Sequence, residues 1–509
     1  MVLHSTTIFI VLLLSLSEIS FAQTVDSPGV HPSITSVTNS HEKSEIQTLR
    51  ISSDTDAKLS KKLKAMINNY MEKDPHRLGI IVIDEAQKKT ILSANLDDNF
   101  HPASNIKLLT SAAALAALGP RYRWKTQFFV ENRIGDSIDN LVVSGSGDPS
   151  YSYDDLTKAI RALKENGIRR IRTQIVLDDS NFKFEGLPPG FSDKNQDGAY
   201  RPAISAFNLN WNQIEIAIFG SSKKKPKVSI FPPSSWIRVK NNTKTTSRVR
   251  RPIRIAQTYH KKYQLLSVKG EIKSGQTQRY RRRVDNPTQH FCAVIKRALS
   301  HYEVLFEGTC RRGKKKRGST LLFSHFSETL DHVLRDVNAW SNNLTAESLV
   351  YAMGNTNGLP NPYVVGLNRV RNFAKTQIGW DKFRLHNGSG LFGRTAVSPR
   401  QLADLLSFMH RNLHAYPEYA GSLAMSEVDG TLKNRFKGMR GARILGKTGT
   451  LDGVSGLSGY IVIDNNKWFS FSILQNDFKG SSVPIRKLQD EILSAIVAWL
   501  RGHETSSEE

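Results

Sequence analysis

The chain has 509 residues, more than one ordinary hydrophobic core accommodates, which predicts two or three domains. Hydrophobic residues make up 39% and charged residues 23%, a balance that excludes a disordered or fibrous protein. The formal net charge of +25 is concentrated, because residues 221–320 hold 27 basic and 4 acidic residues while the remainder is nearly neutral. This distribution excludes a protein that is basic along its whole length.

The first residues of the chain resemble an export signal. An apolar run over 8–16 is followed by Ser-Phe-Ala at 20–22, whose small residues at alternate positions resemble a signal-peptidase site. We expect a signal peptide over 1–22 and an exported protein of the periplasm or cell envelope. Because no lysine or arginine precedes the apolar run, an uncleaved anchor is the alternative. Residues 23–55 are expected to be a disordered spacer, and 503–509 a disordered tail.

Hydrophobic periodicity predicts a mixture of helices and strands, an α+β protein. The first part gives strands over 78–84, 90–94, 125–130 and 140–144, with helices over 59–71, from 104 and over 153–166. The basic segment is mostly strand-like until a helix over 287–302. The last part gives helices over 326–340, 344–353, 369–376, 398–413 and 484–501, with strands over 444–450, 459–464 and 468–475.

Ser104 and Lys107 stand three residues apart at the start of an apolar, alanine-rich stretch. Helical spacing places both side chains on one face, so a hydroxyl and an amine become neighbours. A helix that is apolar on all sides is buried, and burial lowers the pKa of a lysine. Its neutral amine can then take the proton of the serine. Alone, this spacing also occurs by chance on solvated helix faces.

Two further short motifs follow Ser104 and Lys107. Ser341 and Asn343 form a Ser-x-Asn sequence between two predicted helices, and Lys447, Thr448 and Gly449 follow one another in a predicted strand. A lysine and a hydroxyl at a strand edge offer donors to a carboxylate, and glycine permits close approach of a substrate backbone. The order Ser-x-x-Lys, Ser-x-Asn, Lys-Thr-Gly is a much stronger signal than any one motif.

Lys447 also completes the P-loop pattern G-x-x-x-x-G-K-T over 441–448, which would bind a nucleotide. A P-loop requires an apolar strand before it and a helix after it, because the helix N-terminus holds the phosphates. Residues 433–440 are mostly basic and polar, and residues 451–456 read Leu-Asp-Gly-Val-Ser-Gly. Neither flank fits, so we prefer the interpretation as a strand.

With these motifs the chain resembles the penicillin-binding proteins and serine β-lactamases. Among them it resembles the D-alanyl-D-alanine carboxypeptidase/endopeptidase family called penicillin-binding protein 4, or DacB. The sequences GSGDP at 145–149, NGSGL at 387–391 and DGTL at 429–432 resemble further signatures of that family. Asn342 and Asn387 depart from its pattern, since the family often has aspartate at these positions.

The resemblance implies an antiparallel sheet flanked by helices, interrupted by a long insertion. It assigns 56–127 and 318–502 to a discontinuous transpeptidase/β-lactamase-like catalytic domain. Residues 128–317 would be a mostly β insertion of two small subdomains, basic in its second half. The basis is the distance of 237 positions from Ser104 to Ser341 (341 − 104), far more than a minimal β-lactamase needs.

The resemblance also implies a serine D-Ala-D-Ala carboxypeptidase/endopeptidase that acts on peptidoglycan stem peptides through an acyl-enzyme. Ser104 would be the nucleophile, Lys107 its base and Ser341 a proton relay, with no metal or cofactor. The backbone amides of Ser104 and Thr450 would stabilise the oxyanion, and β-lactams would be inhibitors. The residues implied to bind substrate are Asn343, Lys447, Thr448 and Gly449.

Other functions remain open at this point. A β-lactamase or esterase on the same fold would use the same residues, and a non-catalytic cell-wall-binding protein would not need a nucleophile beside a buried amine. A Ser-His-Asp hydrolase is disfavoured, because the chain has no Gly-x-Ser-x-Gly nucleophile elbow.

Cys292 and Cys310 are the only cysteines, and in an exported chain we expect them to form one disulfide. Two buried thiols are the alternative. Residues 193–198 match the first half of a calcium loop, but position twelve would be Ile204 rather than a carboxylate. We therefore expect a polar turn there.

The basic segment 221–320 contains the runs 223–225, 279–283 and 311–317. A charge run is usually a solvated surface, but a net +23 in one inserted region exceeds what solubility requires. We expect attraction to an anionic envelope polymer or a membrane surface. Nucleic acid is the other polyanion that such runs bind, and it conflicts with the predicted export.

Overall fold

The computed structural model of the chain describes residues 50–51, 57–182, 184–194, 197–222, 225–355, 362–412, 414–464 and 466–502. The predicted signal peptide, nearly all of the predicted spacer and the predicted tail lie outside these residues. In the part that is described, no helix has both the length and the apolar character needed to cross a membrane.

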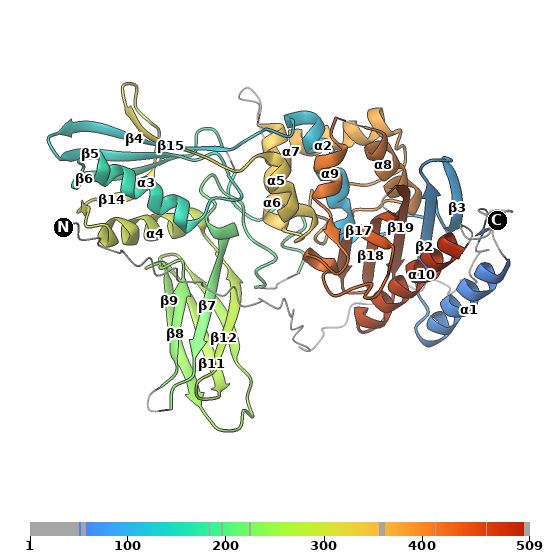
Figure 1. Cartoon of the computed structure of the whole chain (residues 1–509). Coiled ribbons are helices and arrows are strands. Elements are labelled where there is room, and N and C mark those ends of the chain that lie inside the picture. The colour runs from blue at the N-terminus through green and yellow to red at the C-terminus, as the bar shows by residue number, and fades with distance from the viewer. Residues whose placement is uncertain are drawn as a thin grey trace, which may run out of the picture. The chain divides into compact units, whose positions relative to one another are not determined.

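A seven-stranded antiparallel sheet brings the first and last strands of the chain together (Figure 1). Its order is β1-β3-β2-β19-β18-β17-β16, and the β2–β19 pairing joins strands from opposite ends of the sequence. The strands predicted over 78–84 and 90–94 and the three predicted carboxyl-terminal strands are confirmed. Its strands are β1 (Arg50–Ile51), β2 (Arg77–Asp84), β3 (Lys89–Ala94), β16 (Ala424–Met425), β17 (Ala442–Leu451), β18 (Val454–Ile463) and β19 (Lys467–Asn476).

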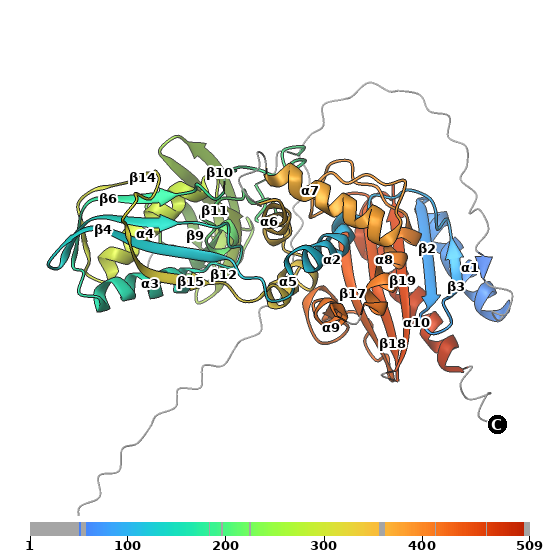
Figure 2. The ribbon, with the colours of Figure 1, turned by 90° about the horizontal axis from the view of Figure 1, so that it is seen from above.

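Helices cover both faces of this sheet (Figure 2). Apolar side chains of α1 (Ala57–Lys73) and α10 (Ser482–Gly502) pack with one face, and those of α2 (Lys107–Leu118) and α8 (Pro399–Arg411) pack with the other. Helices α1 and α10 each bury one apolar stripe against the sheet, whereas α2 is buried on all sides from Lys107 to Leu115. The remaining helices here are α5 (Leu330–Asn338), α6 (Asn343–Gly354), α7 (Pro362–Phe373), the π-helical turn Ala374–Ile378 and α9 (Tyr416–Gly421).

A six-stranded sheet is formed by strands that lie, in sequence, between α2 and α5. Its strands are β4 (Lys125–Ile134), β5 (Ser137–Ser144), β6 (Arg170–Asp178), β13 (Leu305–Phe306), β14 (Thr309–Arg312) and β15 (Thr320–Phe326). Helices α3 (Tyr153–Glu165) and α4 (Pro287–His301) share an apolar core with it. The predicted helix over 326–340 was wrong at its start, because Phe326 ends a strand that pairs with β4 and α5 begins only at Leu330.

Two three-stranded sheets, β12-β7-β8 and β10-β11-β9, contain the first part of the basic segment, and of their strands only β7 precedes residue 221. They share a small apolar core of their own, which includes Ile216, Leu266 and Val268. The strand-like character predicted for this segment is confirmed. The strands of the two sheets are β7 (Gln213–Phe219), β8 (Lys227–Phe231), β9 (Ile237–Thr245), β10 (Arg254–His260), β11 (Tyr263–Ile272) and β12 (Thr277–Arg283).

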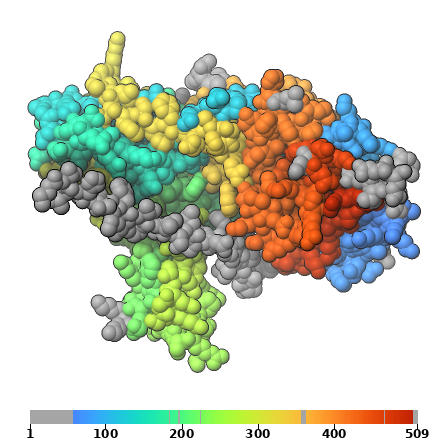
Figure 3. All heavy atoms as spheres, in the orientation of Figure 1, coloured from blue at the N-terminus to red at the C-terminus, as the bar shows by residue number. Residues whose placement is uncertain are grey.

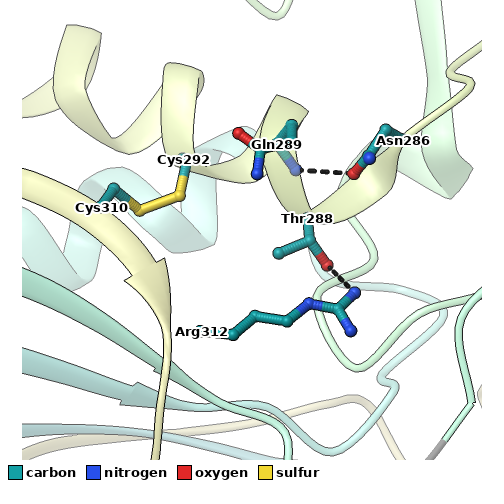
Figure 4. The surroundings of a disulfide bond; sticks show 6 residues. All are labelled: Asn286, Thr288, Gln289, Cys292, Cys310 and Arg312. Atoms are coloured by element: carbon teal, nitrogen blue, oxygen red, sulfur yellow. Dashed lines mark hydrogen bonds between the residues drawn. A yellow bond between two sulfur atoms is a disulfide. The ribbon is translucent and has the colours of Figure 1, made fainter. Parts of the chain in front are cut away.

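Cys292 on α4 and Cys310 on β14 form a disulfide, with their Cα atoms 5.9 Å apart (Figure 4). The predicted bridge is confirmed, and the alternative of two buried thiols is wrong. Beside it, Arg312 Nη2 donates to Thr288 Oγ1 at 3.1 Å, so helix and strand are joined twice. The bridge therefore fastens α4 to the edge of the six-stranded sheet.

Candidate active site

Ser104 and Lys107 lie where the chain enters α2. Residues Ala103–Ile106 form a 3₁₀ turn, and α2 begins at Lys107 without interruption. Every residue from Lys107 to Leu115 is buried, as predicted for a helix that is apolar on all sides. The amine of Lys107 donates a hydrogen bond to Ser104 Oγ at 2.8 Å. The predicted pair of neighbouring hydroxyl and amine is thus present.

Lys107 is fully buried, and its amine has three partners. Besides Ser104, Nζ donates to Asn343 Oδ1 at 2.5 Å and to the Ser389 carbonyl at 2.8 Å. Burial lowers the pKa of Lys107 to about 7, while the carboxylate of Glu347 acts in the opposite direction. A large fraction of the amine is therefore unprotonated near neutral pH and can accept a proton from Ser104.

A second buried amine belongs to Lys447 on β17. Its Nζ donates to Ser341 Oγ at 2.9 Å and to the Thr448 carbonyl at 2.6 Å. Burial lowers the pKa of Lys447 well below its ordinary value, and the nearby charge of Lys107 lowers it further. Each of the two serines is therefore hydrogen-bonded to its own buried lysine. A carboxylate that entered this site would favour the charged form of Lys447.

Gly449 brings β17 against the turn that carries the serine. A Cβ at position 449 would lie 2.7 Å from Asn105 Nδ2, 2.8 Å from the Pro102 carbonyl oxygen and 2.9 Å from the backbone nitrogen of Ser104. Real Cβ atoms essentially never approach so closely, so only glycine fits. We expected Gly449 to admit a substrate backbone, and in the structure it admits the backbone of the protein's own turn.

β17 runs without a break from Ala442 to Leu451 and turns directly into β18. The Gly-Lys-Thr sequence therefore lies inside a strand, and the P-loop interpretation is wrong because no helix N-terminus follows it. On this strand Thr448 is half-buried and Thr450 is exposed, so the side chains of both reach the surface beside Lys447.

Two residues with positive φ adjoin the reacting side chains. Ala103, directly before Ser104, has φ 45°, and Ser341 itself has φ 60°. Residues other than glycine rarely adopt this left-handed conformation, which costs about 1–3 kcal/mol where the surrounding structure imposes it. The fold therefore holds Ser341 itself, and the residue directly before Ser104, in a strained conformation.

A buried carboxylate behind Lys107 was not predicted from the sequence. Oε1 of Glu347 accepts the backbone N–H of Ser389 at 2.8 Å, and Oε2 accepts the N–H of Gly388 at 3.1 Å and the hydroxyl of Tyr363 at 2.5 Å. Burial raises the pKa of Glu347, although these donors favour its charged form. By fixing residues 388 and 389, it holds the Ser389 carbonyl against Lys107. Its only sequence signal is one acidic residue in an otherwise uncharged helix.

The chain around Pro189 and Tyr200, which lies between β6 and β7 in the sequence, also contacts the site. Asn343 Nδ2 donates to the Tyr200 carbonyl at 2.7 Å, and Asn387 Nδ2 donates to the Pro189 carbonyl at 2.8 Å. These contacts join residues 143 and 198 positions apart, so local patterns gave no signal for them. A substrate that bonded to the Asn343 amide would take the place of the Tyr200 carbonyl.

The polar turn predicted over 193–198 lies in the same segment. Asp197 Oδ1 accepts the hydroxyl of Tyr259 at 2.6 Å, while residues 195–196 fall outside the described part of the chain. Among the residues whose placement is described, no group of three histidine, cysteine, aspartate or glutamate side chains is arranged to hold a metal ion. The polar side chains that hydrogen-bond to one another at the candidate site are those of Ser104, Lys107 and Asn343, and of Ser341 and Lys447.

Known proteins match nearly the whole chain. The model of the D-Ala-D-Ala carboxypeptidase 3 (S13) family matches residues 59–501. A D-alanyl-D-alanine carboxypeptidase of Actinomadura sp. (strain R39) is 26% identical over 453 residues, which cover 84% of this chain and 82% of the relative. The D-alanyl-D-alanine carboxypeptidase DacB of Haemophilus influenzae is 24% identical over 405 residues, covering 75% of this chain and 82% of the relative.

Solved structures share the fold. The crystal structure of penicillin binding protein 4 (dacB) from Haemophilus influenzae aligns with a TM-score of 0.72 at 23% identity, covering 85% of this chain and 99% of that one. A structure of the same protein complexed with a β-lactam aligns with a TM-score of 0.68 at 22% identity, with the same coverage. The predicted α+β fold of penicillin-binding type is confirmed.

Proposed function

We propose, on the premise that the chain belongs to the D-Ala-D-Ala carboxypeptidase 3 (S13) family, that it hydrolyses the terminal D-alanyl-D-alanine bond of peptidoglycan stem peptides through an acyl-enzyme on Ser104. The chain is thus a serine-type peptidase. The relatives named D-alanyl-D-alanine carboxypeptidase support this substrate class. Cleavage of peptide cross-links, an endopeptidase action, would use the same residues.

The acylation step follows from the contact between Lys107 and Ser104. The unprotonated amine removes the Oγ proton as Oγ attacks the carbonyl carbon of the penultimate D-alanine. Backbone amides of Ser104 and Thr450 stabilise the oxyanion. The C–N bond then breaks, and Ser341 passes a proton to the leaving nitrogen. D-Alanine departs, and the peptide remains as an ester on Ser104.

Lys447 and Thr448 bind the terminal carboxylate of the substrate in this scheme. The buried amine gains a charge partner when the carboxylate arrives, which offsets the desolvation that lowers its pKa. Asn343 completes the binding surface through its side-chain amide, and Gly449 supports that surface by letting β17 lie against the Ser104 turn. Water then attacks the ester, and the Ser104 Oγ recovers its proton.

The observation that carries the proposal is the buried Lys107 amine 2.8 Å from Ser104 Oγ, with a pKa of about 7. The test is product analysis with purified muropeptides, a pentapeptide monomer and a cross-linked dimer. We expect free D-alanine from the monomer, and cleavage of the dimer would add the endopeptidase activity. If neither substrate changes, the peptidase proposal fails and a wall-binding role is favoured.

β-Lactams are the expected inhibitors, because their strained amide presents a carbonyl to the same nucleophile. A β-lactamase or esterase would release the acyl group rapidly. Turnover of a chromogenic β-lactam separates the two functions, since a peptidase gives one equivalent of product and then stops. Continuous turnover would favour the β-lactamase.

The proposed location is the cell envelope outside the cytoplasm. The signal-like residues 1–22 and the disulfide between Cys292 and Cys310 support export, because disulfides persist in oxidising compartments. The basic segment 221–320 would then be attracted to an anionic envelope polymer or a membrane surface. Salt-sensitive sedimentation with cell-wall sacculi or anionic vesicles tests this attraction.

A further inference from the structure

The six-stranded sheet has a second face that does not pack on α3 and α4. Side chains alternate along each strand, so Phe128 and Val143 join the core with these helices while Phe129, Val142 and Val176 form a small cluster on the other face. The loop 313–319, between β14 and β15, crosses this second face, where Lys315 Nζ lies 5.0 Å from the ring centroid of Phe129. In Figure 3 the yellow part of the chain lies along the upper edge of the molecule, next to the cyan part.

A cavity of about 220 Å³ lies between this face and the loop. Its lining comes from four separate pieces of chain, which fix its shape better than one loop could. The residues used below are Glu131 on β4, Asn140 on β5, Gln174 on β6, Arg311 on β14, and Lys314 and Lys316 on the loop. Three basic residues of the run over 311–317, which was predicted to contribute to attraction of an anionic polymer or membrane surface, therefore line a pocket.

The carboxylate of Glu131 holds the loop on the sheet. Oε2 accepts Asn140 Nδ2 at 2.8 Å, and Oε1 accepts Ser319 Oγ at 2.7 Å and the backbone N–H of Lys316 at 3.3 Å. Burial alone would raise the pKa of Glu131, but these donors outweigh it and lower the pKa. This carboxylate is thus charged and fully engaged, and it does not call for a cationic ligand.

Two other features of the cavity have unused binding capacity. Asn140 is 7% exposed, and its Oδ1 has no hydrogen-bond partner among the described residues, which is costly for a buried acceptor. Arg311 is aligned by the bond from its Nε to Gln174 Oε1 at 3.0 Å, and Lys314 is exposed. Lys316 Nζ is paired with Glu131 Oε2 at 3.9 Å, so Arg311 and Lys314 are the two cations of the cavity that this carboxylate does not neutralise.

We infer that this cavity binds a small anion that carries a hydroxyl group next to its charge, such as one polyol phosphate unit. The phosphate would contact Arg311 and Lys314, and a neighbouring hydroxyl would donate to Asn140 Oδ1. A volume of about 220 Å³ admits one such unit rather than a long segment of polymer. The proposed attraction of the whole basic segment to an anionic polymer thereby gains one specific binding site. This proposal does not depend on the reaction proposed for Ser104.

The experiment is calorimetric titration of the full chain with glycerol 1-phosphate, inorganic phosphate and glycerol in turn, at two salt concentrations. We expect glycerol 1-phosphate to bind about tenfold more tightly than inorganic phosphate and glycerol not to bind. A short poly(glycerol phosphate) in a parallel titration distinguishes a polymer unit from a free metabolite. Equal binding of both phosphates, or none, overturns the inference.

Variants separate the pocket from diffuse attraction. Arg311→Gln with Lys314→Gln should weaken glycerol 1-phosphate about tenfold or more. The matched control, Lys261→Gln with Lys262→Gln, removes the same charge from the distant β10–β11 turn and should change binding less than about twofold. Asn140→Leu, with its folding checked by thermal melting, should abolish the preference over inorganic phosphate. We expect both double variants to release D-alanine at the wild-type rate. If the pocket variant and the control variant lose glycerol 1-phosphate binding equally, the proposal of a discrete site is contradicted.

Discussion

The same side chain behaves in opposite ways in two regions of this molecule. In the candidate active site, Lys107 on α2 and Lys447 on β17 have 0% exposure, and each donates to a serine hydroxyl. In the basic sheets, Lys261 and Lys262 stand exposed at the β10–β11 turn. Burial removes the water that stabilises the charge, and it lowers the pKa of both Lys107 and Lys447. A lysine's environment, and not the number of lysines nearby, decides whether it acts as a base or as a charge.

The largest effect should come from removing the buried base. Lys107→Met fills the same volume without an amine, and we expect kcat/KM for D-alanine release to fall about 10³-fold. The control is Lys261→Met, which deletes an exposed amine and should leave kcat/KM unchanged. Purified proteins are compared by D-alanine release and by thermal melting. If Lys107→Met keeps more than a tenth of the wild-type kcat/KM, Lys107 is not the base that activates Ser104.

The next effect concerns how closely the sheet approaches the serine turn. Gly449→Ala places a methyl group 2.8–2.9 Å from backbone atoms of Pro102 and Ser104, so the turn has to move. We expect kcat/KM to fall about 10²-fold. Gly446→Ala on the same strand is the control, because its methyl would meet neighbours only at 3.3–3.4 Å. Similar losses in both variants would show that any extra methyl on β17 is harmful.

A smaller effect is expected from the carboxylate behind Lys107. Since Lys107 acts in its unprotonated form, kcat/KM should rise with pH around a midpoint near 7. Glu347 raises the pKa of Lys107, so Glu347→Gln should move this midpoint to lower pH and reduce the plateau about tenfold. Glu328→Gln, at an exposed carboxylate, provides the control profile. An unmoved midpoint would mean that Glu347 has only a structural role.

The smallest effect should come from the exposed lysines. Lys261→Gln with Lys262→Gln should change the free energy of unfolding by less than about 0.5 kcal/mol, as is usual for surface substitutions. Neither kcat/KM nor its pH midpoint should move. Sedimentation with sacculi at low salt is the sensitive measurement, and a slight weakening is expected there. A large change in kcat/KM would show that the two regions are coupled.

Much of the fold could be predicted because its signals are local. The hairpin of β2 and β3, the strands β17 to β19 and the helices α4 and α10 follow from periodicity within short windows. The strand β15 was missed because only its pairing with the distant β4 makes it a strand, and its end at Phe326 runs into an apolar pattern that also suits a helix.

The residues of the candidate site also fall into those with a local sequence signal and those without one. Ser104, Lys107, Ser341, Asn343 and Lys447 could be named from motif order, and the structure brings their side chains within hydrogen-bond distance in pairs. Glu347 has no motif, because its role depends on backbone N–H groups about forty positions away. The contact of the Tyr200 carbonyl with Asn343 likewise depends on tertiary folding alone.

The most direct measurement of the central claim is the intact mass of the protein after reaction with a β-lactam. The wild-type chain should gain the mass of one β-lactam, and peptide mapping should place it on the peptide that contains Ser104. Ser104→Ala should gain none, while Ser341→Ala should still be acylated, at a reduced rate. A covalent adduct on Ser104→Ala would contradict the assignment of Ser104 as the nucleophile.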